Sequence, residues 1–342
     1  MKILIVGADS PNALERYYLK YLKEYADVKI FPAQNIFMDY YYQSVIHKII
    51  FRSGFSFIYR TINSLLINEI KQYQPDILFV FKGMEVLPST LKWCRANGIK
   101  LANYNPDHPF IFSGKGSGNK HVSRSIKLYD IHFTYDKYVK QKIEAEYQIQ
   151  TEVVPFGFDI EDSVYNKICN SNNEIHKACF VGSPDRDRVQ FIKRLADNGV
   201  YVDVYGFNWD RYLHHRRIAI FPPVYEDQFW YTLRRYRVQL NMLRKHNLTS
   251  HNMRSFEVPG VGGILLAPYT EDHAQFFDPD SDIYLYTNFS TCIHKIHYLL
   301  SLSNDDAMKI RIRARNKSIL SGYTYKERVI SVFNYLKSLN NK

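Results

Sequence analysis

Residues 241–269 read NMLRKHNLTSHNMRSFEVPGVGGILLAPY and join two apolar runs through a polar, cationic segment. The pattern predicts a strand that ends near residue 240, then a polar loop, a short helix, a glycine turn at 260–263 and a second strand at 264–267. Such a loop favours an anion, because unpaired backbone N–H groups and a helix dipole act there beside Arg and Lys side chains. Glycines allow the backbone to lie close to a ligand or to the next strand. We therefore expect this segment to bind a pyrophosphate.

Two parts of the chain share one order of strand, loop and helix. Residues 2–6 form a β-branched apolar run before a glycine, and a helix is expected at 13–24. Residues 177–181, 182–188 and 189–198 repeat this order. The alternation predicts an α/β fold with two Rossmann-like domains. A single glycine after the first strand lacks the dinucleotide fingerprint, so no NAD or other cofactor is predicted.

The predicted short helix and the segment after it carry an ordered set of polar, glycine and aromatic residues: Asn252-x-Arg254-x-Phe256-Glu257, Gly262-Gly263 and Phe276-Phe277-x-Pro279. This order resembles the donor-binding half of group 1 glycosyltransferases, and within them the CgeB-like branch. The resemblance implies the GT-B fold, in which two Rossmann-like domains face each other across a cleft. It also implies that the C-terminal domain binds a nucleotide-sugar.

The resemblance implies roles for single residues. Glu257 would bind the ribose hydroxyls, and Tyr205-Gly206 would lie near the nucleotide base. Arg188 begins a helix and would reach a phosphate. The alternative is a solvated arginine that pairs with Asp185. Thr249 stands where many group 1 enzymes carry a second glutamate that contacts the donor sugar, so retaining and inverting chemistry both stay open. The full predicted donor-binding set is Gly182, Arg188, Tyr205, Gly206, Arg244, Lys245, Asn252, Arg254 and Glu257.

The chain divides into four predicted parts. An acceptor-side domain is expected at 1–159, and a polar linker at 160–176, where Asn-Ser-Asn-Asn stands at 170–173. The nucleotide-sugar-binding domain is expected at 177–324. The final helix, 325–342, is expected to pack back on the first domain, as the resemblance implies.

A candidate base lies in the first domain. A predicted strand at 99–104 runs into Asn-Pro-Asp-His-Pro, which places Asp107 and His108 side by side at the carboxyl end of that strand. Either side chain could take a proton from a hydroxyl acceptor. The alternative is a turn in which Asp107 bonds only to its own backbone.

Residues 35–66 combine many aromatic and β-branched side chains with His47, Lys48, Arg52 and Arg60. A helix of this composition can lie in a membrane interface. The alternative is a helix that is buried on one side, with its cations extended along apolar surface toward water. Both interpretations stay open at this point.

Composition narrows the classes of partner. The chain has 342 residues, is 46% hydrophobic and carries a formal net charge of +11, which fits two domains and an anionic ligand or anionic membrane surface. The cations are spread along the chain without a zinc-finger or RNP signature, so no nucleic acid partner is predicted. Four cysteines far apart and no signal-peptide pattern predict a cytoplasmic protein, at the inner face of the cell membrane if it contacts lipid.

No metal site is predicted. Asp278, Asp280 and Asp282 could suggest Mg²⁺, but their spacing is also typical of a turn between a helix and a strand. His214 and His215 are adjacent, and adjacent side chains rarely converge on one ion.

These observations predict a metal-independent glycosyltransferase that moves a sugar from a nucleoside-diphosphate donor to a hydroxyl on a glycan or lipid-linked acceptor. A role in bacterial surface glycan, polysaccharide or glycoconjugate assembly would follow. Two alternatives remain. A nucleotide-sugar epimerase of similar fold would need no acceptor, and a catalytically silent polysaccharide, coat or membrane-surface protein would bind no nucleotide.

Overall fold

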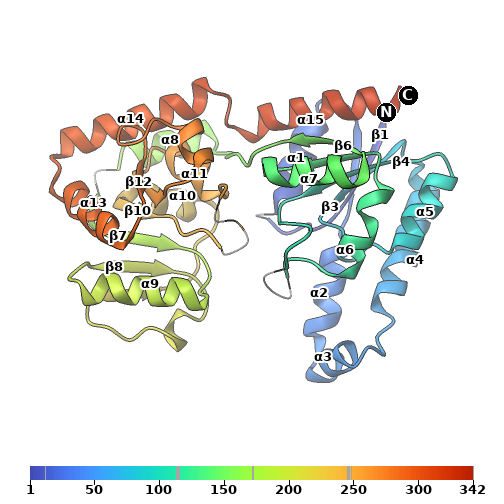
Figure 1. Ribbon diagram of the computed structural model, residues 1–342, viewed down its shortest axis with the longest axis horizontal. Helices are drawn as coiled ribbons and strands as arrows, with labels where there is room; N and C mark the ends of the chain where they lie inside the picture. The colour runs from blue at the N-terminus through green and yellow to red at the C-terminus, as the bar shows by residue number, and fades with distance from the viewer. Residues whose placement is uncertain (12, 113–115, 172, 245–246, 248, 342) are drawn as a thin grey trace. The chain divides into compact units, whose positions relative to one another are not determined.

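The computed structural model describes residues 1–11, 13–112, 116–171, 173–244, 247 and 249–341 (Figure 1). It divides into two compact units. Unit 1 comprises Met1–Pro155 together with Tyr325–Lys342, and unit 2 comprises Phe156–Thr324.

Unit 1 is built on a six-stranded parallel sheet in the order β2-β1-β3-β4-β5-β6. Its strands are β1 (Lys2–Val6), β2 (Asp27–Phe31), β3 (Ile77–Phe81), β4 (Lys100–Asn105), β5 (Ile131–Thr134) and β6 (Gln150–Val153). Its α-helices are α1 (Leu14–Leu22), α2 (Ala33–Gln43), α3 (Val45–Arg52), α4 (Ile58–Tyr73), α5 (Pro88–Ala96), α6 (Lys120–Ser125), α7 (Lys137–Tyr147) and α15 (Tyr325–Asn340), and a 3₁₀ turn covers Ile126–Leu128.

The core of unit 1 explains this order. β3 reads ILFVF and is buried along its whole length, as expected for a central parallel strand with helices on both faces. β1 lies between β2 and β3, so the chain reverses its direction of winding there. The carboxyl ends of β1, β3 and β4 therefore border the crevice where open parallel sheets bind ligands.

Unit 2 repeats the plan in the order β12-β11-β10-β7-β8-β9, again with parallel pairs. Its strands are β7 (Ile175–Val181), β8 (Val202–Tyr205), β9 (Ile218–Phe221), β10 (Tyr236–Leu240), β11 (Leu265–Pro268) and β12 (Tyr284–Tyr286). Its α-helices are α8 (Asp162–Cys169), α9 (Arg186–Asp197), α10 (Glu226–Arg235), α11 (Arg254–Gly260), α12 (Glu271–Phe276), α13 (Phe289–Ser301) and α14 (Asn304–Leu320), and a 3₁₀ turn covers Trp209–Arg211.

The segment at 241–269 folds in the predicted order of strand, loop, helix, turn and strand, as β10, α11 and β11. The prediction of an α/β fold with two Rossmann-like domains is also confirmed, since each unit holds its own six-stranded parallel sheet. The turn needs its glycines. Gly262 has φ +70°, and a Cβ on Gly263 would lie 2.7 Å from the Leu233 carbonyl oxygen, so side chains there would be strained or would clash.

The boundaries between the parts differ from the predicted ones. Residues 156–159 belong to unit 2, although they were expected in the first domain. Residues 160–176, expected as a polar linker, also belong to unit 2 and contain α8. The Arg315 guanidinium lies 4.2 Å from the centre of the Tyr165 ring, and Ile168 is buried. α8 is thus fixed by contacts with residues far away in the sequence.

Helix α15 packs on α1 inside unit 1 (Figure 1). The rings of Tyr17 and Tyr325 are stacked with centroids 4.4 Å apart, and those of Tyr25 and Phe333 are 5.1 Å apart. No helix in the described ranges is long and apolar enough to cross a bilayer.

Residues 35–66 form parts of three helices instead of one. The chain breaks at Ser44, whose Oγ accepts a hydrogen bond from the His47 N–H, and again at 53–57. α3, between these breaks, has no buried residue. A single helix buried on one side is therefore not what residues 35–66 form. α3 meets its neighbours through side chains that are not fully buried, such as Phe51 beside Phe37 and Tyr59, and His47, whose ring lies 4.8 Å from that of Tyr40.

Candidate functional site

Two glycines bring the loops after β7 and β8 into backbone contact. The Gly182 N–H donates to the Tyr205 carbonyl oxygen at 2.9 Å. A Cβ on Gly206 would lie 2.3 Å from the Gly182 carbonyl oxygen, closer than any side chain tolerates. The indole N–H of Trp209 also donates to that oxygen, at 2.8 Å. The predicted residues Gly182 and Gly206 thus meet at the carboxyl edge of the sheet.

Arg188 joins the loop after β7 to the loop after β10. Asp185 caps α9 and accepts from the Arg188 N–H at 3.0 Å, which sets the start of the helix. The guanidinium donates to the Ser183 carbonyl at 3.1 Å and to the Met242 carbonyl at 2.8 Å. Burial lowers the pKa of the guanidinium, Asp185 opposes that change, and the positive charges of Arg244 and Arg254 add to it, so that the pKa falls to about 10.

The charges of Arg188, Arg244 and Arg254 therefore act on one another at the same edge of unit 2. Such repulsion costs stability in the free protein and favours an anion at this place. One donor is still available for it, since Nε of Arg254 is buried without a hydrogen-bond partner among the described residues. Nε of Arg188 is also buried without a hydrogen bond there, but it lies 3.4 Å from a carboxylate oxygen of Asp185. Buried donors are rarely left unpaired, so this arrangement points to a ligand with several acceptor oxygens.

Arg254 and Glu257 form an ion pair within α11. The Arg254 guanidinium also lies 4.4 Å from the centre of the Phe229 ring. Burial raises the pKa of the Glu257 carboxyl, and Arg254 opposes that rise. Glu257 is thus a buried carboxylate that one cation neutralises. Arg188 has the exposed carboxylate of Asp185 as its counter-charge, at 3.4 Å.

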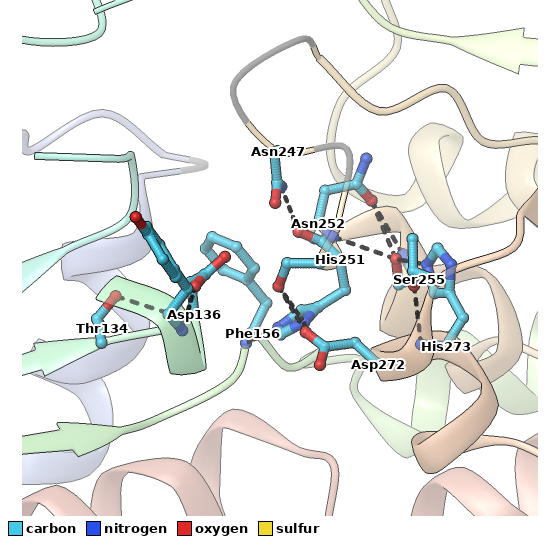
Figure 2. A network of polar contacts seen from close by, with 12 residues as sticks. Thr134, Asp136, Phe156, Asn247, His251, Asn252, Ser255, Asp272 and His273 are labelled. Atoms are coloured by element: carbon cyan, nitrogen blue, oxygen red, sulfur yellow. Dashed lines mark hydrogen bonds and ion pairs between the residues drawn. The ribbon is translucent and has the colours of Figure 1, made fainter. Parts of the chain in front are cut away.

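Asn252 holds the end of β10 and the start of α11 together through hydrogen bonds. Its amide exchanges hydrogen bonds with the amide of Asn241, at 3.0 and 2.8 Å, and its oxygen accepts from the Ser255 N–H at 3.2 Å. These bonds tie the end of β10 to the start of α11 (Figure 2). The structure gives Asn252 this positioning role, while its predicted role in donor binding stays a prediction.

Two histidines behind the loop were not predicted as part of the site. His251 is fully buried and its Nδ1 lies 2.8 Å from a carboxylate oxygen of Asp272. His273 places Nδ1 2.9 Å from the Pro268 carbonyl and Nε2 2.8 Å from the Ser255 hydroxyl (Figure 2). Burial lowers the pKa of His273 to about 4, so this imidazole is neutral and accepts from Ser255. The partners lie 18 and 21 positions apart, and no local pattern signals such pairs.

Tyr205 lies beside the glycine contact. Its ring stacks on Phe221 with centroids 4.7 Å apart, and its hydroxyl is 2.9 Å from the Tyr236 hydroxyl. Tyr236 in turn donates to Asp203 at 2.8 Å. This series of hydrogen bonds holds the Tyr205 ring in one orientation at the end of β8. The remaining predicted donor residue, Lys245, lies outside the described residues.

In unit 1, Asp107 follows β4 and is ion-paired with Lys82, which follows β3, at 2.5 Å. Lys82 has φ +59°, an uncommon conformation for a residue with a side chain, and Gly83 follows with φ +94°. The Lys82 ammonium also donates to the Gly116 carbonyl. A strained turn thus brings a cation to the predicted base.

His108 is fixed by the backbone. Its Nδ1 accepts from the N–H groups of Phe110 and Ile111 at 3.2 and 3.1 Å. A neutral imidazole with Nδ1 occupied in this way carries its proton on Nε2. In this geometry His108 can donate a hydrogen bond but cannot take a proton at Nε2, so Asp107 is the stronger candidate for a base.

Two buried carboxyl groups near Lys82 were not predicted. Glu15 accepts from the Ala8 N–H at 2.8 Å, and burial raises the pKa of its carboxyl. Burial also raises the pKa of Glu85 to about 7, although the charge of Lys82 opposes the rise. Both groups lie at the carboxyl ends of β1 and β3, where the topology places the crevice of unit 1. Gly7 leaves the space for Glu15, since a Cβ there would lie 2.3 Å from its carboxylate.

No cluster of three or more His, Cys, Asp or Glu side chains suited to a metal ion occurs among the residues described by the structure. The three-aspartate segment at 278–282 forms a turn. Asp280 lies in the left-handed region at φ +59°, and its carboxylate pairs with Lys295.

Comparison with known proteins places these features in context. Residues 186–334 match the protein family described as glycosyl transferase-like, which supports a group 1 glycosyltransferase. The sequence search matched no curated protein.

Solved structures show the same fold. Sucrose-phosphate synthase from Thermosynechococcus elongatus superposes with a TM-score of 0.70 at 8% identity, over 99% of each chain. A glycosyltransferase from Rickettsia africae gives 0.63 at 15% identity, over 99% of this chain and 98% of the other. UDP-GlcNAc 2-epimerase from Neisseria meningitidis, bound to UDP-GlcNAc, gives 0.60 at 13% identity, over 99% and 100%. The fold is therefore GT-B.

Proposed function

We propose that the protein transfers a sugar from a nucleoside-diphosphate donor to a hydroxyl acceptor. One observation carries the proposal. Arg188, Arg244 and Arg254 act on one another at the carboxyl edge of the sheet of unit 2, and among the described residues the buried Nε of Arg254 has no hydrogen-bond partner. Glu257 is paired with Arg254 beside them. A diphosphate supplies the negative charge and the oxygens that this cluster lacks.

The same cluster accounts for the chemistry of the leaving group. When the bond between the anomeric carbon and the phosphate oxygen breaks, negative charge grows on the diphosphate. Arg188 and Arg244 would stabilise that charge without a metal ion, because fixed cations act where charge develops in the transition state. Glu257 would accept hydrogen bonds from the ribose hydroxyls, with Arg254 holding its carboxylate in place.

Unit 1 would provide the groups that meet the acceptor. In an inverting reaction the acceptor oxygen attacks the anomeric carbon while its proton passes to Asp107. Lys82 positions that carboxylate, and His108 would donate from Nε2 to another acceptor oxygen. We place the acceptor among the glycans or lipid-linked glycans of bacterial surface assembly, and we propose that the sequence belongs to the CgeB-like branch.

A nucleotide-sugar epimerase is the second candidate. Thr249 stands where a sugar-contacting glutamate is common in group 1 enzymes, and an epimerase is among the proteins of similar fold. An epimerase would use the same diphosphate cluster but would return an altered nucleotide-sugar and release no nucleoside diphosphate.

The test is to incubate the protein with single nucleotide-sugars, with and without a mixture of glycan acceptors, and to identify the products by mass spectrometry. Acceptor-dependent release of a nucleoside diphosphate supports glycosyl transfer. An isomeric nucleotide-sugar formed without acceptor would replace it with the epimerase. Arg188→Gln should lower the yield of either product, whereas Arg313→Gln, which changes an exposed residue of α14, should leave it unchanged.

A further inference from the structure

We propose that residues 42–57, which comprise the end of α2, α3 and the loop after it, form a docking surface for anionic lipid. This surface, called the α3 tip below, belongs to unit 1 and contains none of the site residues described above. It goes beyond glycosyl transfer and does not depend on it. Figure 1 shows α3 at the ends of α2 and α4 that lie away from the sheet of unit 1.

The α3 tip presents large apolar side chains to solvent. Ile46 and Ile49 on the helix are 66% and 60% exposed, and Phe55 and Phe57 in the loop are 78% and 67% exposed. Val45 adds to the same surface. Single exposed apolar residues are ordinary, but a contiguous set on one short segment marks an interaction site.

The conformation of the α3 tip is fixed by contacts on its other side. The Phe51 ring meets the rings of Phe37 and Tyr59 at centroid distances of 5.0 and 5.7 Å. Ser56 donates to the Tyr40 hydroxyl at 3.0 Å. The helix therefore has an anchored side and an outward apolar side.

The charged residues of the α3 tip indicate which kind of partner binds there. Residues 40–68 contain Lys48, Arg52 and Arg60 and no Asp or Glu. The Lys48 ammonium lies 4.6 Å from the centre of the Tyr42 ring, and the Arg60 guanidinium lies 5.5 Å from that of Phe57. Cations beside apolar and aromatic side chains match an anionic bilayer surface, where the cations meet phosphates and the apolar groups enter the acyl boundary.

A second copy of the chain fits this surface less well. A two-fold contact would bring the same cations of both copies together without a counter-charge. A stable dimer also buries about 800 Å² on each partner, more than one two-turn helix and a loop can offer.

The experiment is sedimentation of the full-length protein with vesicles of phosphatidylglycerol or of phosphatidylcholine. We expect binding to phosphatidylglycerol vesicles that weakens with salt, and little binding to phosphatidylcholine. Lys48→Glu should weaken the binding about tenfold or more, since each basic residue near an anionic surface contributes several-fold. Ile49→Ser should weaken it about tenfold, because it removes one inserted aliphatic side chain.

Matched controls separate docking from general charge and folding. Lys193→Glu reverses an exposed cation of α9, and Leu320→Ser removes an exposed leucine of α14; both should bind vesicles as the unaltered protein does. All variants should unfold at the same temperature, since the changed side chains are not buried. Vesicle binding that survives both Lys48→Glu and Ile49→Ser would overturn the proposal. So would a dimer, found by light scattering without vesicle binding, that Ile49→Ser dissociates.

Discussion

Replacing Arg188 with Gln should separate ligand binding from folding at the diphosphate cluster. Hydrogen bonds to charged groups contribute about 1.5–3 kcal/mol each. The loss of one such bond to a phosphate predicts nucleoside-diphosphate affinity lower by roughly tenfold to a hundredfold. Arg188→Lys keeps the charge but cannot reach the Ser183 and Met242 carbonyls together, so affinity should be intermediate.

The stability of the ligand-free protein should change less than its affinity for the nucleoside diphosphate. The change removes hydrogen bonds to two carbonyl oxygens, which costs about 1–3 kcal/mol for each one left unpaired. It also removes a buried charge whose pKa of about 10 corresponds to about 3 kcal/mol of unfavourable free energy in the folded state. These terms oppose each other, so the unfolding temperature without ligand should change little.

The assay is isothermal titration calorimetry with nucleoside diphosphates, combined with thermal unfolding with and without ligand. We expect the Arg188→Gln protein to unfold near the temperature of the unaltered protein but to lose the ligand-dependent rise. Equal affinity in the two proteins would refute the assignment of the cluster to the diphosphate. A large fall in unfolding temperature without ligand would show instead that Arg188 is structural.

Three further predictions follow from other residues. Asp107→Asn should reduce turnover by a factor of about 10²–10⁴ without changing donor affinity, as steady-state kinetics would show. Asp305→Asn is the control. Undiminished turnover in Asp107→Asn would exclude Asp107 as the base. Glu85→Gln should stabilise the protein by up to about 3 kcal/mol at pH 8 and not at pH 4. A carboxyl with a raised pKa stabilises the fold below its unfolded pKa and loses that contribution as pH rises through about 7. Equal gains in thermal unfolding at both pH values would contradict the burial argument. Gly206→Ala should destabilise unit 2 by more than about 1 kcal/mol through its clash with Gly182. Gly199→Ala meets no atom within 4 Å, so it should cost only the backbone strain of φ +92° and less than Gly206→Ala; a smaller loss for Gly206→Ala in denaturant unfolding would count against the loop contact.

The sequence predicted the fold where local patterns are strong. The apolar runs of β3, β10 and β11 and the glycine turn at 260–263 predicted the parallel sheets and the order of elements in unit 2. α8 was missed because its residues are polar and rich in Asn nearby, and its packing depends on Arg315, 150 positions after Tyr165.

The candidate site was predicted in part. Residue types and spacing indicated the arginines and Glu257, and the structure brings Arg188, Arg244 and Arg254 within reach of one another's charge. The pairs that fix the site were not predictable. Lys82 and Asp107 belong to different strands, and the neutral state of His273 arises from burial.

The α3 tip shows the limit of composition as a guide. The same aromatic and cationic residues fit a half-buried helix and a membrane-facing one equally well. Only the exposed fractions of Ile46, Ile49, Phe55 and Phe57 separate the two interpretations. Burial depends on the whole fold, which a local pattern does not contain.

The most direct measurement is thermal unfolding of the protein with UDP, GDP, CDP, ADP and TDP in the presence of a metal chelator, repeated on Glu257→Gln. A ligand that binds the folded state must raise the unfolding temperature by mass action. We predict a rise with one of the five in the unaltered protein, and a smaller rise in the variant because the ribose contact is weakened. No rise with any nucleotide, or a rise that requires a divalent metal, would contradict a metal-independent diphosphate site built from Arg188, Arg244 and Arg254.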